Sequence, residues 1–165
     1  MDPSSLEMNR REAGAAYMGA MRSLGLEPNG LFWAYDEFAH QFVLILVTDF
    51  FDFKGPLEIS KLLFEAYNRS GTPREIDPFI VRLHSPAHAI ISRLMLGLGG
   101  AMIKGSPGKP LPEGIEVSGV KFDGIQVYAD WVYKRPSVRK KSTPSPIDLS
   151  RKWDRFVRHI DRLAA

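Results

Sequence analysis

Two carboxylates and two histidines lie close to the ends of two predicted strands, where they could do chemistry. Asp49 and Asp52 follow one apolar strand, and His84 ends the next strand, with His88 four residues further along the chain. Carboxylate oxygens and imidazole nitrogens can hold a divalent metal such as manganese or zinc. Alternatively, His84 or His88 could be the acid–base group of an enzyme that hydrolyses or transfers a phosphate. The candidate catalytic residues are therefore Asp49, His84 and His88, and the candidate metal ligands are Asp49, Asp52, His84 and His88.

These four residues also have an ordinary structural interpretation, which we favour. Carboxylates and histidines at the ends of helices and strands commonly cap helices or close turns. Ser85-Pro86 separates His84 from His88, so the two imidazoles do not share one continuous helical face. The pattern therefore predicts no bound cofactor, and a small metal- or phosphate-dependent hydrolase is kept as the alternative function.

A second region, residues 134–165, carries most of the positive charge. It holds ten Lys or Arg against three Asp, a net +7, whereas the rest of the chain holds twelve against sixteen, a net −4, for a total of +3. Such a separation indicates an acidic body with a basic appendage that serves in interactions. Three prolines and three serines in 135–146 are typical of an extended, exposed linker.

The end of this region, 147–165, has the pattern of an amphipathic helix. One stripe is apolar, and basic side chains occupy most of the rest; Asp148 and Asp154 are spaced for i,i+4 pairs with Lys152 and Arg158. We expect partners to be bound by residues of the linker and of this helix. They are Arg139, Lys140, Lys141, Arg151, Lys152, Trp153, Arg155, Phe156, Arg158 and Arg162.

The apolar stripe must be buried somewhere, and the sequence leaves three alternatives open. The helix could pack on its own body or exchange with a second copy of the chain. Its basic face could bind nucleic acid through the phosphates. It could also insert into a protein groove or lie on an anionic membrane. Our first hypothesis is a small non-enzymatic binding protein that contacts a partner or a second copy of itself, with Trp153 and Phe156 as apolar anchors.

The elements that position these residues predict an α+β fold with a mixed sheet. Hydrophobic periodicity, glycines and prolines give alternating helices and strands. The strand 31–38 is mixed in character, as is typical near a sheet edge, and the helix 87–97 is apolar nearly all round, as in a buried helix. The expected helices are 6–24, 56–70, 87–97 and 147–165, and the expected strands are 31–38, 42–48, 79–84, 115–122 and 125–133.

The unit 42–84 predicts a right-handed parallel crossover, strand to helix to strand. Parallel strands end at the same edge of a sheet, so Asp49, Asp52, His84 and His88 should lie near one another. The carboxyl edge is also where ligands usually bind in α/β sheets. This geometry is the basis of the candidate catalytic site.

A hairpin around Asp123-Gly124 is the clearest local signal, because this dipeptide favours a type I′ turn. It pairs Phe122 with Ile125. The side chains expected on its buried face are Val120, Phe122, Ile125, Val127, Ala129 and Trp131.

Composition limits the class of protein. The chain has 165 residues, 44% hydrophobic and 25% charged, which is typical of one globular domain: a body 1–133, a linker 134–146 and the helix 147–165. The absence of cysteine excludes disulfides, thiolate metal sites and a cysteine nucleophile. The N-terminus lacks the pattern of a secretory signal, and the longest aliphatic run, 42–47, is far below the ~20 residues of a membrane span. We therefore expect a cytoplasmic protein.

Overall fold

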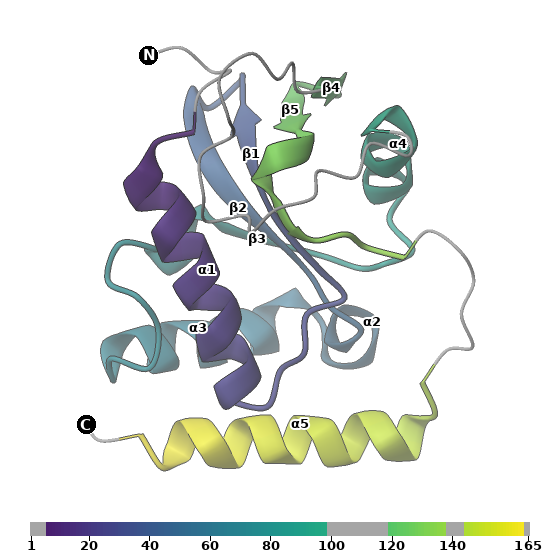
Figure 1. Ribbon diagram of the computed structural model, residues 1–165. Coiled ribbons are helices and arrows are strands. Elements are labelled where there is room, and N and C mark those ends of the chain that lie inside the picture. Colours follow the sequence, from purple (N-terminus) through teal and green to yellow (C-terminus); the bar gives the residue numbers. More distant parts are fainter. Residues whose placement is uncertain (1–5, 99–118, 138–143, 164–165) are drawn as a thin grey trace.

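A mixed sheet with helices on both faces forms the molecule in the computed structural model, which describes residues 6–98, 119–137 and 144–163 (Figure 1). The α+β class is confirmed. The helices are α1 (Met8–Ser23), α2 (Phe50–Lys54), α3 (Pro56–Asn68), α4 (Ala89–Leu98) and α5 (Pro146–Asp161), with 3-10 turns η1 (Pro78–Ile80) and η2 (Ala129–Trp131). The strands are β1 (Gly30–Asp36), β2 (Gln41–Val47), β3 (Val81–His84), β4 (Gly119–Phe122), β5 (Ile125–Tyr128) and β6 (Val132–Lys134).

The described strands follow the order β3-β2-β1-β5-β4, and β6 also pairs with β1. The β2–β3 pair is parallel and places Val47 opposite His84, whereas the other pairs are antiparallel. The predicted parallel pairing of these two strands is therefore confirmed, and the connection between them runs through α2 and α3. The short helix α2 was not predicted, and Gly55 separates it from α3 with a φ of 83°, a backbone conformation that favours glycine.

The prediction that the first strand lies near the sheet edge is wrong. β1 is central, because it pairs with β2 on one side and with β5 and β6 on the other. The charged residue of this strand, Asp36, is buried, and its carboxylate has partners. Its carboxylate pairs with Arg82 and accepts backbone N–H groups from Phe38 and Ala39, and these interactions lower its pKa although burial acts to raise it.

Two apolar layers cover the two faces of the sheet. Leu31 and Trp33 of β1 point into the larger layer, beneath α1, α2, α3 and α5, while Phe32 and Ala34 point to the other face, beneath α4. Figure 1 shows the same division, with α4 on its own side of the sheet. The helix α4 buries only one face and exposes 70% of Leu96, so the prediction of a helix buried all round is wrong for its described side chains.

The hairpin register is confirmed: Phe122 pairs with Ile125 across a turn in which Asp123 and Gly124 both have positive φ. Its expected buried face is correct only in part, because Phe122 is 37% exposed and Trp131 lies in the layer opposite to that of Ile125. The turn η2 breaks the alternation of the strand before Trp131 and sends the indole to the other side. The first part of the expected strand, 115–118, lies outside the described residues.

Candidate functional site

The carboxyl ends of β2 and β3 lie side by side, as the crossover requires. The backbone N–H of Thr48 donates to the carbonyl of His84 at 3.1 Å, which continues the pairing beyond the strands. The Thr48 hydroxyl then accepts the N–H of Phe50 at 3.2 Å and caps α2, whereas Asp49 makes no side-chain cap. Among the four candidate residues, Asp49 has no described hydrogen bond or ion pair with Asp52, His84 or His88.

Ser85 organises this edge, although the sequence analysis did not name it as a site residue. Its hydroxyl donates to Asp52 Oδ2 at 2.5 Å and accepts the N–H of Ala87 at 3.1 Å, and the residue is fully buried. The bond ties α2 to the segment that leads into α4. A hydroxyl engaged in this way is a structural link, and the Ser85-Pro86 dipeptide was the available sequence signal for it.

The structure also brings His84 and His88 together, with 3.0 Å between their Nδ1 atoms. The N–H of Ser85 donates to Nδ1 of His88 at 3.2 Å, so that nitrogen is an acceptor, and the bond between the rings assigns its proton to Nδ1 of His84. The ring of Phe51 meets His88 edge-on at 4.7 Å. Burial, with the charges of His88 and Arg82, lowers the pKa of His84 to about 4, so His84 is neutral at pH 7.

Most of the polar side chains at this edge form hydrogen bonds with one another. Asp52 is bonded to Ser85, and each histidine is bonded to the other. Among the described residues, no group of three or more His, Asp or Glu side chains is arranged to hold a metal ion. Two imidazoles alone fall short of the three or four protein ligands that are typical of zinc sites.

The apolar stripe of α5 is buried against its own chain. Leu149, Trp153, Phe156 and Ile160 belong to the larger apolar layer, and the ring of Phe50 lies 5.2 Å from that of Trp153. At the other end of the helix, Arg69 donates from Nη1 to the carbonyls of Ile160 and Asp161, both at 3.2 Å. Trp153 and Phe156 are thus core residues in this structure and are not free to act as partner anchors.

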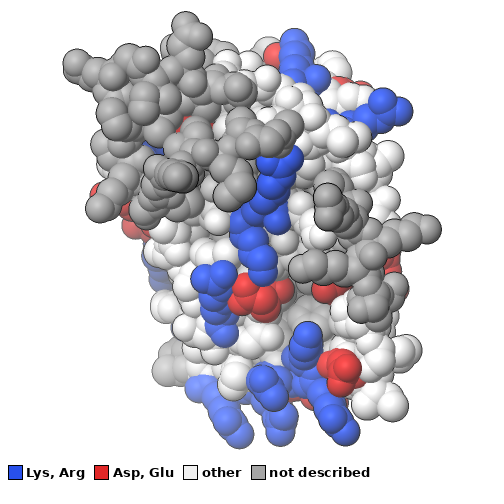
Figure 2. Space-filling model, turned by 45° about the vertical axis from the view of Figure 1, so that its right-hand side comes forward, with Lys and Arg blue, Asp and Glu red and all other residues white. Residues whose placement is uncertain are grey.

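The opposite face of α5 is basic and exposed. Figure 2 shows Lys and Arg side chains gathered along the lower edge of the molecule, where α5 lies in Figure 1. Five Lys and Arg residues lie on this face. Within the described part of the chain none of the five forms an ion pair, and the i,i+4 pairs expected for Lys152 and Arg158 are not formed. The five are Arg151, Lys152, Arg155 and Arg158 of α5 and Arg162, the C-terminal cap of the helix, whose backbone is still helical and which we count with α5. The linker candidates Arg139, Lys140 and Lys141 lie outside the described residues.

The first two cations of the linker, Lys134 and Arg135, are engaged with the body instead. Lys134 pairs with Glu27 at 2.8 Å, and Arg22 pairs with the same carboxylate at 2.9 Å. Hydrogen bonds from these two side chains lower the pKa of Glu27. Arg135 donates to the carbonyl of Met95 at 2.8 Å. The free positive charge of the described C-terminal region is therefore concentrated on α5.

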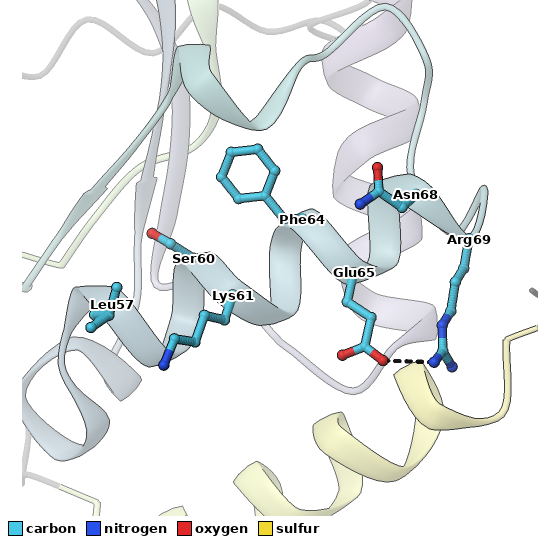
Figure 3. Close-up of a pocket in the computed structure, with 7 residues that line it drawn as sticks. All are labelled: Leu57, Ser60, Lys61, Phe64, Glu65, Asn68 and Arg69. Atoms are coloured by element: carbon cyan, nitrogen blue, oxygen red, sulfur yellow. Dashed lines mark ion pairs between the residues drawn. The ribbon is translucent and has the colours of Figure 1, made fainter.

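A surface hollow of about 440 Å³ lies on α3 and contains none of the candidate site residues. Figure 3 shows its lining side chains spread along that one helix, with Glu65 and Arg69 joined by an ion pair of 2.8 Å. The lining residues are Leu57, Ser60, Lys61, Phe64, Glu65, Asn68 and Arg69. The hollow lacks a set of polar groups that converge from several elements, as ligand pockets usually have.

No helix among the described residues is long and apolar enough to cross a membrane. No protein-family model matches the chain, and neither the curated proteins nor the solved structures contain a match to it.

Proposed function

We propose that this protein binds nucleic acid through the exposed basic face of α5, without catalysing a reaction. One observation carries the proposal: five exposed cations on α5 have no ion-pair partner among the described residues, while the other face of the same helix is fixed in the core. Cations that are not paired within the chain are available to neutralise phosphates, and phosphate contacts give affinity without a recognition motif.

The burial of the apolar stripe argues against the other partners that the sequence left open. Insertion into a protein groove uses the apolar face of a helix, and so does attachment to a membrane surface. That face of α5 is occupied by its own body, and the large apolar side chain that α5 still exposes is Ile147, at 66%. Exchange of α5 between two copies is also not needed to bury Trp153 and Phe156. The remaining ligand is one that binds through its charge alone. Nucleic acid has the required charge density, since double-stranded DNA carries one negative charge per about 1.7 Å of its axis.

The test must remove charge while keeping α5 in place. Deletion of residues 134–165 would uncover the core beneath Trp153 and Phe156, so lost binding could simply reflect unfolding. We would instead change Arg151, Arg155, Arg158 and Arg162 to Gln together in the full chain. Glutamine favours helices about as well as arginine, and all four side chains are exposed.

Fluorescence anisotropy with labelled oligonucleotides at 50 and 200 mM salt measures the effect. We expect the unaltered protein to bind at 50 mM salt and to weaken steeply at 200 mM, and the quadruple variant to lose at least a hundredfold in affinity at 50 mM salt. Arg93→Gln is the matched control, because Arg93 is exposed on α4, on the other face of the sheet. Absence of binding by the unaltered protein at 50 mM salt, or unchanged binding by the folded quadruple variant, would overturn the proposal.

A further inference from the structure

The four arginines of α5 form a single straight row. They follow the spacing i, i+4, i+7, i+11, which places them within an arc of about 60° around the helix and spreads them over about 16 Å along its axis. The buried stripe of Leu149, Trp153, Phe156 and Ile160 has the same spacing two residues earlier, which turns it to the opposite side of the helix. The row, Arg151, Arg155, Arg158 and Arg162, therefore lies on the side of α5 opposite the buried stripe. All four residues are exposed, and the Cγ and Cδ atoms of Arg155 lie beside Gly25.

Acidic residues flank this row. Asp154 and Asp161 are exposed on one side of it, about 70–90° from its centre line, and neither forms an ion pair with an arginine of the row. A helix with its side chains is about 10–12 Å across and fills a DNA major groove of about 12 Å, so both its flanks face phosphates. On α5 one of those flanks would bring Asp154 and Asp161 against a wall of negative charge. The geometry thus disfavours insertion into a groove.

The exposed face also lacks aromatic side chains on which bases could stack, and its arginines could pair with guanine in a duplex only from within a groove. Trp153 and Phe156 are the only Trp, Tyr or Phe residues of α5, and both are buried. The helix has no Asn or Gln, the residues that pair with adenine in a duplex. Arginine, in contrast, binds phosphate oxygens with two parallel N–H groups of its planar guanidinium. The chemistry of the row therefore fits the sugar–phosphate backbone.

Together these observations carry one inference, which rests on the proposed function: we propose that the arginine row of α5 binds the backbone of single-stranded nucleic acid along one track of about four phosphates. A duplex strand rotates by about 100° over three base-pair steps, so a straight row reaches about two of its successive phosphates before the strand turns away. A single strand is free to follow the whole row. The contacts are the same for DNA and RNA, because they involve phosphates alone.

The experiment compares labelled dT12, rU12 and a 12-base-pair DNA duplex by fluorescence anisotropy, with the full-length protein at 50 and 200 mM salt. Four phosphate contacts to a single strand predict an affinity that falls about 50-fold over this range, whereas two contacts to a duplex predict a fall of about 12-fold. We expect dT12 and rU12 to bind equally within twofold, and both more tightly than the duplex at 50 mM salt.

The variant Arg155→Gln removes one contact from the middle of the row. With three contacts left, the fall for dT12 between 50 and 200 mM salt should shrink from about 50-fold to about 18-fold, and Arg93→Gln should leave it at about 50-fold. Duplex binding as tight as that of dT12, or a tenfold preference between dT12 and rU12, would overturn this inference and leave the proposed function standing. Absence of binding to all three oligonucleotides would overturn both.

Discussion

The carboxyl edge formed by the ends of β2 and β3 and the exposed face of α5 both carry several polar side chains, but those side chains differ in what they contact. At the edge, Asp52 is bonded to Ser85, and His84 and His88 are bonded to each other. On α5, the arginines extend from the surface, and none is paired with an acid among the described residues. Polar groups that satisfy one another stabilise a fold, whereas exposed charges without partners remain available for a ligand.

The largest expected effect tests whether α5 belongs to the core. Phe156 is fully buried, with its ring 6.0 Å from both Phe50 and Trp153. Phe156→Ala should lower the free energy of unfolding by about 3–5 kcal/mol, because it removes buried apolar surface and leaves a cavity. Urea unfolding followed by tryptophan fluorescence measures it. Ile147→Ala, an exposed position on the same helix, should change stability by less than about 0.5 kcal/mol. Equal small effects for both variants would show that α5 is not held on the body in solution.

A smaller effect is expected at the edge, from Ser85→Ala. The substitution removes a donor to Asp52 and an acceptor for the N–H of Ala87, both in a buried position. Loss of buried hydrogen bonds typically lowers stability by about 1–3 kcal/mol, and we expect about 2 kcal/mol in urea unfolding. Asp52→Asn, which keeps an acceptor for the hydroxyl, should lose less. A neutral Ser85→Ala variant would remove the argument that this edge is a structural junction.

The parts of the fold that sequence predicted well depend on local chemistry. The hairpin register follows from Asp123-Gly124, and the parallel pairing of β2 with β3 follows from the order strand, helix, strand along the chain. The wrong predictions concern features that depend on tertiary contacts. Nothing local shows that Asp36 would be paired with Arg82, or that η2 would turn Trp131 to the other side of the sheet.

The same limit applies to the two candidate sites. Spacing and topology placed Asp52, His84 and His88 at one edge, but only the side-chain positions show that Ser85 holds Asp52. For α5 the helical period gave the apolar stripe, and its spacing alone cannot say whether that stripe packs in cis or on a partner. Contact with Phe50, more than ninety residues away, decides this in the structure.

The histidine pair predicts a pH dependence at the edge. The pKa of His84 is lowered from 6.5 to about 4 in the folded protein, so the unfolded chain takes up its proton first as the pH falls. The folded state should therefore lose stability between about pH 6.5 and pH 4, and regain it as the pH rises through that window. Urea midpoints across the window measure this, and His84→Gln should flatten the curve. His40→Asn, at an exposed position, should leave its slope unchanged.

The smallest expected effect is the change in melting temperature when a ligand is added that could bind at the carboxyl edge of β2 and β3. A large change that depends on His84 would show that this edge, which we interpret as structural, is a binding site. We interpret the bonds among Asp52, Ser85, His84 and His88 as structural. If so, 1 mM manganese, zinc or phosphate should raise the melting temperature by less than about 1 °C. The reason is that a ligand stabilises a protein only by binding to its folded state. A rise of several degrees that His84→Ala abolishes would instead favour the metal- or phosphate-dependent hydrolase. Retention of that rise in His84→Ala would place the ligand elsewhere, and Arg155→Gln would then show whether phosphate binds α5.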